Sequence, residues 1–306
     1  MHVIVGAGSI GTAIAEELAA AGTPSTVVTR SGSGPVHPLV KRTAADVSDA
    51  AAFRKVAKGA TVIYNCVNPP YHAWPKEWPP ISRSMITAAE ENDAVLAITG
   101  NLYGYGPVDR PMTEDMPLAA TSVKGRVRAA MWEEALAAPI RTLEVRASDY
   151  IGPRYTIMEM TLPAMRAGKT AWVPGALDVP HSYTYVGDVA HTLVELASDQ
   201  RAWGKAWHAP TAPPLTAREI LTRLAKVAGL PAPRLRSYPL LAVRAAALTD
   251  KFVKEFLEVR YQHVRPFVLD SERVRATFGL TYTPLDEALY RTAVGSEKVP
   301  SKSTSE

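Results

Sequence analysis

Val3-Ile4-Val5-Gly6-Ala7-Gly8-Ser9-Ile10-Gly11 stands almost at the start of the chain and decides the fold. The three leading apolar residues predict a short buried strand, and residues 12–21 predict a helix. Between a strand and a helix, the spacing G-x-G-x-x-G is typical of a turn that binds a dinucleotide. Gly6 permits the tight turn, Gly8 lets the backbone approach a pyrophosphate, and Gly11 lets the helix pack closely on the strand. The predicted cofactor contacts at this helix N-terminus are Gly6, Gly8, Ser9, Ile10 and Gly11.

The residues after the second predicted strand indicate which dinucleotide is bound. That strand covers residues 25–29 and is followed directly by Arg30 and Ser31. An acidic residue here would bind the free 2′-hydroxyl of NAD, whereas an arginine suits the 2′-phosphate of NADP. Arg30 can form two hydrogen bonds with a phosphate, and Ser31 adds a hydroxyl donor. We therefore expect NADP, with a solvated loop arginine as the other interpretation of Arg30.

Short apolar strands alternate with helical segments through the first half of the chain. Residues 60–66, 95–99 and 141–146 predict further strands. Within the first of these, residues 62–64 are continuously apolar, as in a strand buried on both faces. The alternation predicts an α/β fold of the Rossmann type with a doubly wound parallel sheet. Ligands of such sheets bind outside the carboxyl ends of the strands. The strand at 95–99 would therefore place Thr99 beside the cofactor.

A second motif begins where that strand ends. Thr99-Gly100-Asn101-Leu102-Tyr103-Gly104 is followed by Lys124-Gly125-Arg126-Val127-Arg128 on a predicted helix. Together these segments resemble the active-site region of the extended short-chain dehydrogenases/reductases, the group that includes the nucleotide-sugar epimerases and other NAD-dependent epimerase/dehydratase-like proteins. That family has a Ser or Thr shortly before a Tyr-Gly, and a Tyr-x-x-x-Lys on the next helix. Here Thr99 keeps the first position, whereas Lys124 replaces the catalytic Tyr and Arg128 replaces the catalytic Lys.

The resemblance implies acid–base chemistry at a substrate oxygen. In the family the phenol exchanges a proton with a hydroxyl or carbonyl group, and the Ser or Thr hydroxyl helps to hold the oxyanion. The ammonium of Lys124 could donate that proton, with Arg128 one helical turn on favouring its release and binding the nicotinamide ribose. Two alternatives are open. Tyr103 replaces the missing phenol, or Lys124 and Arg128 are an exposed basic pair and catalysis is lost or lies elsewhere.

The resemblance also assigns cofactor contacts beyond the glycine turn. Asp46 and Val47 match an Asp-hydrophobic pair that flanks the adenine in this family. Cys66, Val67 and Asn68 match the segment that family members place against the ribose on the nicotinamide side. These five residues complete the predicted cofactor site.

The resemblance covers residues 2 to about 290 and implies two lobes. Residues 146–154 resemble the segment by which family members leave the cofactor domain, and residues 183–190 resemble the segment by which the chain returns, with Asp188 as a helix cap. We expect an NADP-binding domain over residues 1–150, joined again by 180–200. Residues 151–179 and 201–295 would form a smaller, mostly helical substrate lobe, and 296–306 a disordered polar tail.

Aromatic and histidine side chains occur in the segments expected to contact a substrate. The loop at residues 68–75 is aromatic, is stiffened by prolines and follows the fourth strand directly, so we expect a lid over the nicotinamide. Such a lid favours an apolar or ring-bearing substrate over a nucleotide sugar. The histidines have no spacing typical of a metal site, and no metal is expected. The predicted substrate-binding residues are Tyr71, His72, Trp74, Tyr150, Tyr155, His181 and Tyr183.

Composition argues against several other classes of protein. The 34 Lys and Arg residues exceed the 30 Asp and Glu residues by only four and are dispersed, so no nucleic-acid partner is expected. No apolar run reaches the length of a membrane span, and the single cysteine permits no disulfide within the chain. Because the first strand leaves no room for a signal peptide, we expect a cytoplasmic protein. The resemblance implies a homodimer formed through helices near residues 80–92 and 122–138.

These observations predict an NADP-dependent oxidoreductase that acts on a carbonyl or hydroxyl group of a small organic substrate, with Lys124 as a non-standard acid. The alternative is a protein that binds NADP(H) without redox turnover. It would be a sensor, or a redox-neutral isomerase, lyase or cyclase that retains the scaffold. The absorbance of the reduced nicotinamide in the presence of candidate carbonyls separates turnover from binding alone.

Overall fold

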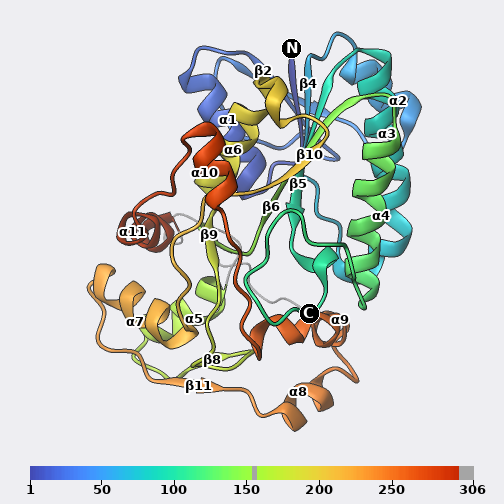
Figure 1. Ribbon diagram of the computed structural model, residues 1–306. Coiled ribbons are helices and arrows are strands. Elements are labelled where there is room, and N and C mark those ends of the chain that lie inside the picture. The colour runs from blue at the N-terminus through green and yellow to red at the C-terminus, as the bar shows by residue number, and fades with distance from the viewer. Residues whose placement is uncertain (154–156, 296–306) are drawn as a thin grey trace.

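A parallel sheet of seven strands lies at the centre of the computed structural model, which describes residues 1–153 and 157–295 (Figure 1). The strand order is β10-β6-β5-β4-β1-β2-β3, and all six neighbouring pairs are parallel. The order reverses direction at β1, as in a doubly wound nucleotide-binding sheet. The predicted Rossmann-type fold is therefore confirmed. The strands are β1 (His2–Val5), β2 (Ser25–Thr29), β3 (Val40–Ala44), β4 (Val62–Asn65), β5 (Val95–Asn101), β6 (Arg141–Ala147) and β10 (Lys205–His208).

Helices cover both faces of this sheet. On one face α1 (Ser9–Ala20) packs against α6 (Val186–Ser198), and on the other face α2 (Ala50–Ala57), α3 (Trp74–Glu91) and α4 (Val123–Ala137) lie side by side (Figure 1). The apolar β1 serves both layers, because Ile4 belongs to the core under α1 and α6 whereas Val3 and Val5 belong to the opposite core. Burying each such side chain contributes about 1.5–3 kcal/mol to stability.

A smaller group of elements lies beyond the carboxyl edge of the sheet. It has a third apolar core built from α5, α7 and α11, and two small parallel pairs of strands, β7 with β9 and β8 with β11. Its strands are β7 (Asp149–Ile151), β8 (Ala171–Val173), β9 (Tyr183–Tyr185) and β11 (Leu235–Ser237). The remaining helices of the described chain are α5 (Ile157–Arg166), α7 (Ala217–Val227), α8 (Leu240–Ala246), α9 (Lys251–Val259), α10 (Glu272–Phe278) and α11 (Leu285–Gly295). None of the helices in residues 1–153 and 157–295 combines the length and apolar character that a bilayer crossing requires.

The structure differs from the sequence-based expectations at two points. Strand β10 falls within residues 201–295, which we expected in the substrate lobe, yet it pairs with β6 at the edge of the central sheet. Asp188 is not the cap of α6, because that helix already begins at Val186. The Asp188 carboxylate instead accepts hydrogen bonds from the backbone N–H and the hydroxyl of Thr283, at 3.0 and 2.6 Å. The expected disordered tail at 296–306 lies outside the described residues.

Candidate functional site

The turn after β1 has room only for glycine at two of its positions. Gly6 has a φ of +103°, and a Cβ there would lie 2.6 Å from the carbonyl oxygen of Cys66. A Cβ on Gly11 would overlap the carbonyl oxygen of Gly6. Helix α1 starts directly after Gly8, and in the described chain no side chain caps it and no acidic residue occupies its first turn. Its terminal N–H groups are therefore free to bind an anion, which fits a dinucleotide pyrophosphate.

The side of this turn predicted to bind the adenosine brings together the ends of β2 and β3. Arg30 and Ser31 follow β2 and are exposed, and Asp46 follows β3 with an exposed carboxylate. Hydrogen bonds from the Ser48 hydroxyl and N–H hold the pKa of Asp46 below its ordinary value, with a smaller contribution from the Arg30 charge. Arg30 makes no hydrogen bond within residues 1–153 and 157–295, so its guanidinium is available to a phosphate. Val47, beside Asp46, is buried in the core.

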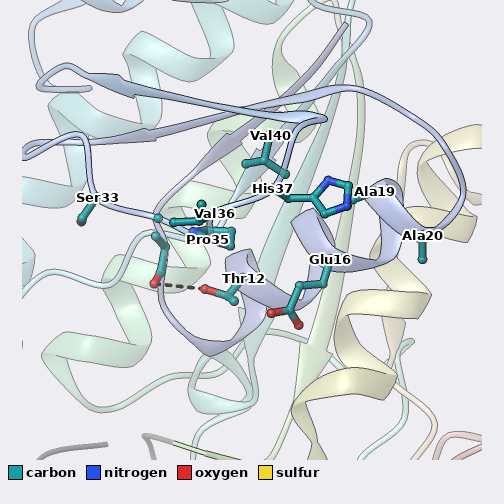
Figure 2. Close-up of a pocket in the computed structure, with 11 residues that line it drawn as sticks. Thr12, Glu16, Ala19, Ala20, Ser33, Pro35, Val36, His37 and Val40 are labelled. Atoms are coloured by element: carbon teal, nitrogen blue, oxygen red, sulfur yellow. Dashed lines mark hydrogen bonds between the residues drawn. The ribbon is translucent and has the colours of Figure 1, made fainter. Parts of the chain in front are cut away.

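A cavity of about 710 Å³ runs along α1 on this side of the molecule. Figure 2 shows Thr12 and Glu16 of α1 forming one wall, and the loop that contains Ser33, Pro35, Val36 and His37 forming the other. The Thr12 hydroxyl donates to the carbonyl of Ala7 at 3.4 Å (Figure 2). The Glu16 carboxylate lines this cavity and would repel a phosphate, so the cavity does not suit a phosphate group. None of the predicted catalytic residues lines the cavity.

The predicted nicotinamide side lies where β4 and β5 end. The hydroxyl of Thr99 is 3.7 Å from the sulfur of Cys66, and the thiol has its pKa raised to about 12 by burial, with Thr99 acting in the opposite direction. Cys66 and Val67 are half-buried, and Asn68 is exposed. Neighbouring parallel strands thus bring Thr99 and Cys66 together although they are 33 residues apart in sequence.

Arg128 is buried beneath this edge and lies directly behind Thr99. Its Nη2 donates to the backbone carbonyl of Thr99 at 2.5 Å and lies 3.4 Å from the carboxylate of Glu144, and its guanidinium stands 5.2 Å from the ring of Trp78. Burial lowers the pKa of Arg128, and Glu144 opposes that change. Its Nε is buried with no hydrogen-bond partner in the described chain. An orphaned donor here fits the predicted contact with a ribose hydroxyl.

Lys124 is also buried, with only 1% of its side chain exposed. Its ammonium forms ion pairs with two carboxylates of α9, Glu255 and Glu258, the second at 2.6 Å. The alternative of an exposed basic pair at 124 and 128 is therefore wrong. Sequence reasoning missed both glutamates, because Glu255 and Glu258 lie on an amphipathic helix more than a hundred residues away. Their spacing alone would have indicated an ordinary solvated face.

Two tyrosines near this edge share a hydrogen bond. The hydroxyls of Tyr71 and Tyr103 are 2.8 Å apart, and the amide of Gln262 donates to Tyr103 at 3.5 Å. Burial raises the pKa of Tyr103 well above its ordinary value and raises that of Tyr71 to about 12. Both phenols therefore hold their protons at neutral pH. The ring of Trp74 packs edge-on against Tyr71 with ring centres 5.0 Å apart, so this residue of the expected lid is part of the core.

The other predicted substrate residues do not all lie at one place. Tyr150 lies at the same edge as Thr99, since its hydroxyl donates to the carbonyl of Gly100 at 3.5 Å, and burial raises its pKa. His181 and Tyr183 are buried together, with ring centres 4.9 Å apart. His72 is exposed. Tyr155 lies outside the described residues.

Three features define a protein of the extended short-chain dehydrogenase/reductase type. They are the parallel sheet of the dinucleotide-binding kind, the uncapped helix after the glycine turn, and the contact of Arg128 with Thr99 at the end of β5. The model of the NAD dependent epimerase/dehydratase family matches residues 2–207. The chain belongs to that family, which is named for two kinds of enzyme.

Several solved structures share this fold. The Bordetella bronchiseptica enzyme WbmH, solved with NAD+, has 18% identity and a TM-score of 0.77 over 97% of this chain and 98% of its own. A UDP-glucose 4-epimerase from Thermus thermophilus, solved with NAD, has 19% identity and a TM-score of 0.77 over 98% and 100%. A dTDP-glucose 4,6-dehydratase from Bacillus anthracis, also with NAD, has 17% identity and a TM-score of 0.76 over 97% of each chain. No curated protein matches the sequence significantly.

Proposed function

We propose that this protein is an NADP-dependent oxidoreductase that acts on a carbonyl or hydroxyl carbon of a small organic substrate. When bound, the nicotinamide supplies or accepts the hydride. The observation that carries the proposal is the meeting of Thr99, Cys66 and Arg128 at one strand edge, with the orphaned Nε of Arg128 suited to a ribose hydroxyl. Tyr71, the aromatic residue of the expected lid that contacts Tyr103 near this edge, supports an apolar or ring-bearing substrate over the nucleotide sugars named for some structures of similar fold.

In this proposal Lys124 exchanges the proton with the substrate oxygen, and the Thr99 hydroxyl holds that oxygen in place. In the reducing direction the ammonium gives one proton to the oxygen as the carbon gains the hydride, and Lys124 becomes neutral. Glu255 and Glu258 are 26% and 24% exposed, whereas Lys124 is 1% exposed. The two carboxylates therefore connect the buried amine to solvent and provide the path by which a proton returns to it.

The second candidate function, binding of NADP(H) without redox turnover, is favoured by two observations. Two carboxylates already neutralise the ammonium of Lys124, and the phenols of Tyr71, Tyr103 and Tyr150 have raised pKa values. A protein that only senses NADP(H) would need no acid at this edge, and a redox-neutral enzyme could place its acid elsewhere. Incubation of the NADPH complex with a panel of carbonyls distinguishes the two functions, because only the oxidoreductase loses the absorbance of the reduced nicotinamide.

The preference for NADP is expected to depend on Arg30. The proposal predicts that NADPH binds more tightly than NADH, and that Arg30→Ala weakens NADPH binding on the order of 10- to 100-fold, because a charge-assisted contact contributes about 1.5–3 kcal/mol. NADH affinity should stay close to wild type. Calorimetric titration of both cofactors measures this. Arg54→Ala, which removes an exposed arginine paired with Glu91 on α3, is the matched control. Equal affinity for the two cofactors in the wild type would contradict the assignment.

We also propose a homodimer formed through α3 and α4. These helices pack against each other, and the outward face of α4 carries Ala130, Leu136 and Ala137. Small exposed residues permit close contact between helices. Light scattering should give the mass of two chains across a range of concentrations, and Ala130→Arg should give the mass of one. Ala20→Arg, at the exposed end of α1, should stay dimeric. A wild-type monomer mass would refute this proposal.

A further inference from the structure

One carboxylate and two imidazoles meet where the chain leaves the central sheet. Oδ2 of Asp149 lies 3.3 Å from Nε2 of His181 and 3.5 Å from Nδ1 of His263. All three ligand atoms lie within 4.8 Å of one another. The residues come from β7, from the segment before β9 and from the turn after α9, so no local spacing in the sequence indicates the cluster.

The hydrogen bonding of His181 shows that this cluster needs a positive centre. Its Nδ1 lies 3.1 Å from the backbone carbonyl of Gln262. A carbonyl oxygen only accepts, so Nδ1 carries the proton and donates it. In the neutral ring Nε2 is then an acceptor. It lies 3.5 Å from the Ser148 hydroxyl and, closer, faces a carboxylate oxygen of Asp149 at 3.3 Å. Two acceptors at that distance repel each other unless a cation or a second proton lies between them.

We propose that Asp149, His181 and His263 form a binding site for a divalent transition-metal ion, with Zn²⁺ as the reference ion. Two imidazoles and one carboxylate are the donors that Zn²⁺ and Fe²⁺ accept readily, whereas Mg²⁺ and Ca²⁺ prefer oxygen alone. With metal–ligand bonds of about 2.1 Å, tetrahedral ligands lie about 3.4 Å apart. The two measured separations from Asp149, 3.3 and 3.5 Å, agree with that spacing.

The bond from His181 to Gln262 is also the outer contact that a metal-binding histidine requires. Metal-ligating imidazoles usually donate their second N–H to a carbonyl or carboxylate, which fixes the tautomer and points the bare nitrogen at the ion. His181 is 6% exposed and held in this way. The ring of His263 is nearly parallel to that of His181, at 11°, and must turn to direct its Nδ1 to the same point. The turn must also break its stacking on the ring of Phe256, whose centre lies 5.1 Å away.

The site is open on one side and lies next to the candidate active site. Asp149 is 29% exposed and His263 14%, so a fourth ligand can reach the ion from solvent. The chain neighbours of these ligands reach the Thr99 edge, since Tyr150 donates to Gly100 and Gln262 donates to Tyr103. Three protein ligands with an open position are typical of a site where a water or substrate oxygen binds. This inference does not depend on the proposed hydride transfer.

Zinc titration of the full chain tests the site directly. After treatment with a chelator, calorimetry with Zn²⁺ should give one site per chain, and Co²⁺ should give the visible absorption of a site with nitrogen and oxygen ligands. His181→Ala and His263→Gln should each weaken Zn²⁺ binding at least tenfold. His263→Gln, at the more exposed position, keeps the test meaningful if His181→Ala does not fold. Circular dichroism establishes folding for each variant.

The control is the only other group of this kind within residues 1–153 and 157–295, which consists of Glu17, His191 and Glu195. It is more exposed, with 49% of the His191 side chain accessible. His191→Ala should leave the stoichiometry and affinity unchanged. The proposal is overturned if Zn²⁺ does not bind to the wild type, if folded His181→Ala and His263→Gln bind it as well as the wild type, or if His191→Ala alone removes the binding.

Discussion

Gly11→Ala is expected to abolish dinucleotide binding. The added Cβ overlaps the carbonyl oxygen of Gly6, so the turn after β1 must move away from α1 and the helix N-terminus loses its position. Because we propose that these N–H groups bind the pyrophosphate, we expect NADPH affinity to fall by at least 100-fold, equivalent to about 2.7 kcal/mol. The quenching of protein fluorescence on NADPH addition measures the affinity.

A control is needed because this substitution also lowers stability. Gly22→Ala, just after the same helix, introduces strain at a φ of +73° but meets no atom within 4 Å. We expect it to lower the melting temperature, since a left-handed conformation costs roughly 1–2 kcal/mol in a residue with a Cβ. NADPH binding should nevertheless be retained. If Gly11→Ala bound NADPH as tightly as the wild type, the glycine turn would not be the cofactor site.

Lys124→Met should lower turnover by at least 100-fold while NADPH affinity stays near the wild-type value. Positioned acids contribute about 10²–10⁴ in rate, and methionine fills much of the same buried space. The variant leaves Glu255 and Glu258 without their partner, but both are partly exposed and can be solvated. Initial rates with the true substrate, measured at the reduced-nicotinamide band, report turnover.

The matched control is Arg126→Ala on the same helix, which removes an exposed basic side chain that donates to the carbonyl of Thr121. It should keep full activity. Full activity in Lys124→Met would instead mean that another group is the acid, with Tyr103 as the next candidate. The double change Lys124→Tyr with Arg128→Lys restores the family pair, and we expect it to create reductase activity toward simple carbonyls.

Features that are local in sequence could be predicted, and those that depend on distant segments could not. The glycine turn combines a strand, three glycines and a helix start within eleven residues, so its geometry follows from the sequence alone. Helix α7 shows the same locality, because the capping box at its start joins Thr216 to Glu219, only three residues on. Strand β10 was missed because it has only four residues and begins just beyond residue 200, where we expected the chain to leave the cofactor domain again.

The surroundings of Lys124 show the same limit at the candidate site. The family motif indicated that Lys124 and Arg128 occupy the two catalytic positions. The charged partners of both side chains, however, come from other segments of the chain. Lys124 is paired by α9, and Arg128 is paired by Glu144 of the neighbouring strand. No periodicity in a single segment encodes such pairs, because each partner is an ordinary charged residue in its own sequence context.

A crystal structure with NADP+ tests most directly the central claim that the cofactor and the proposed acid meet at one edge. We expect the pyrophosphate on the N–H groups of Ser9 and Ile10, and the 2′-phosphate on Arg30 and Ser31. We also expect the nicotinamide ribose on Arg128, with Lys124 and Thr99 facing the same side of the ring. A nicotinamide bound away from Thr99 and Lys124, or a 2′-phosphate that does not contact Arg30, would contradict this claim.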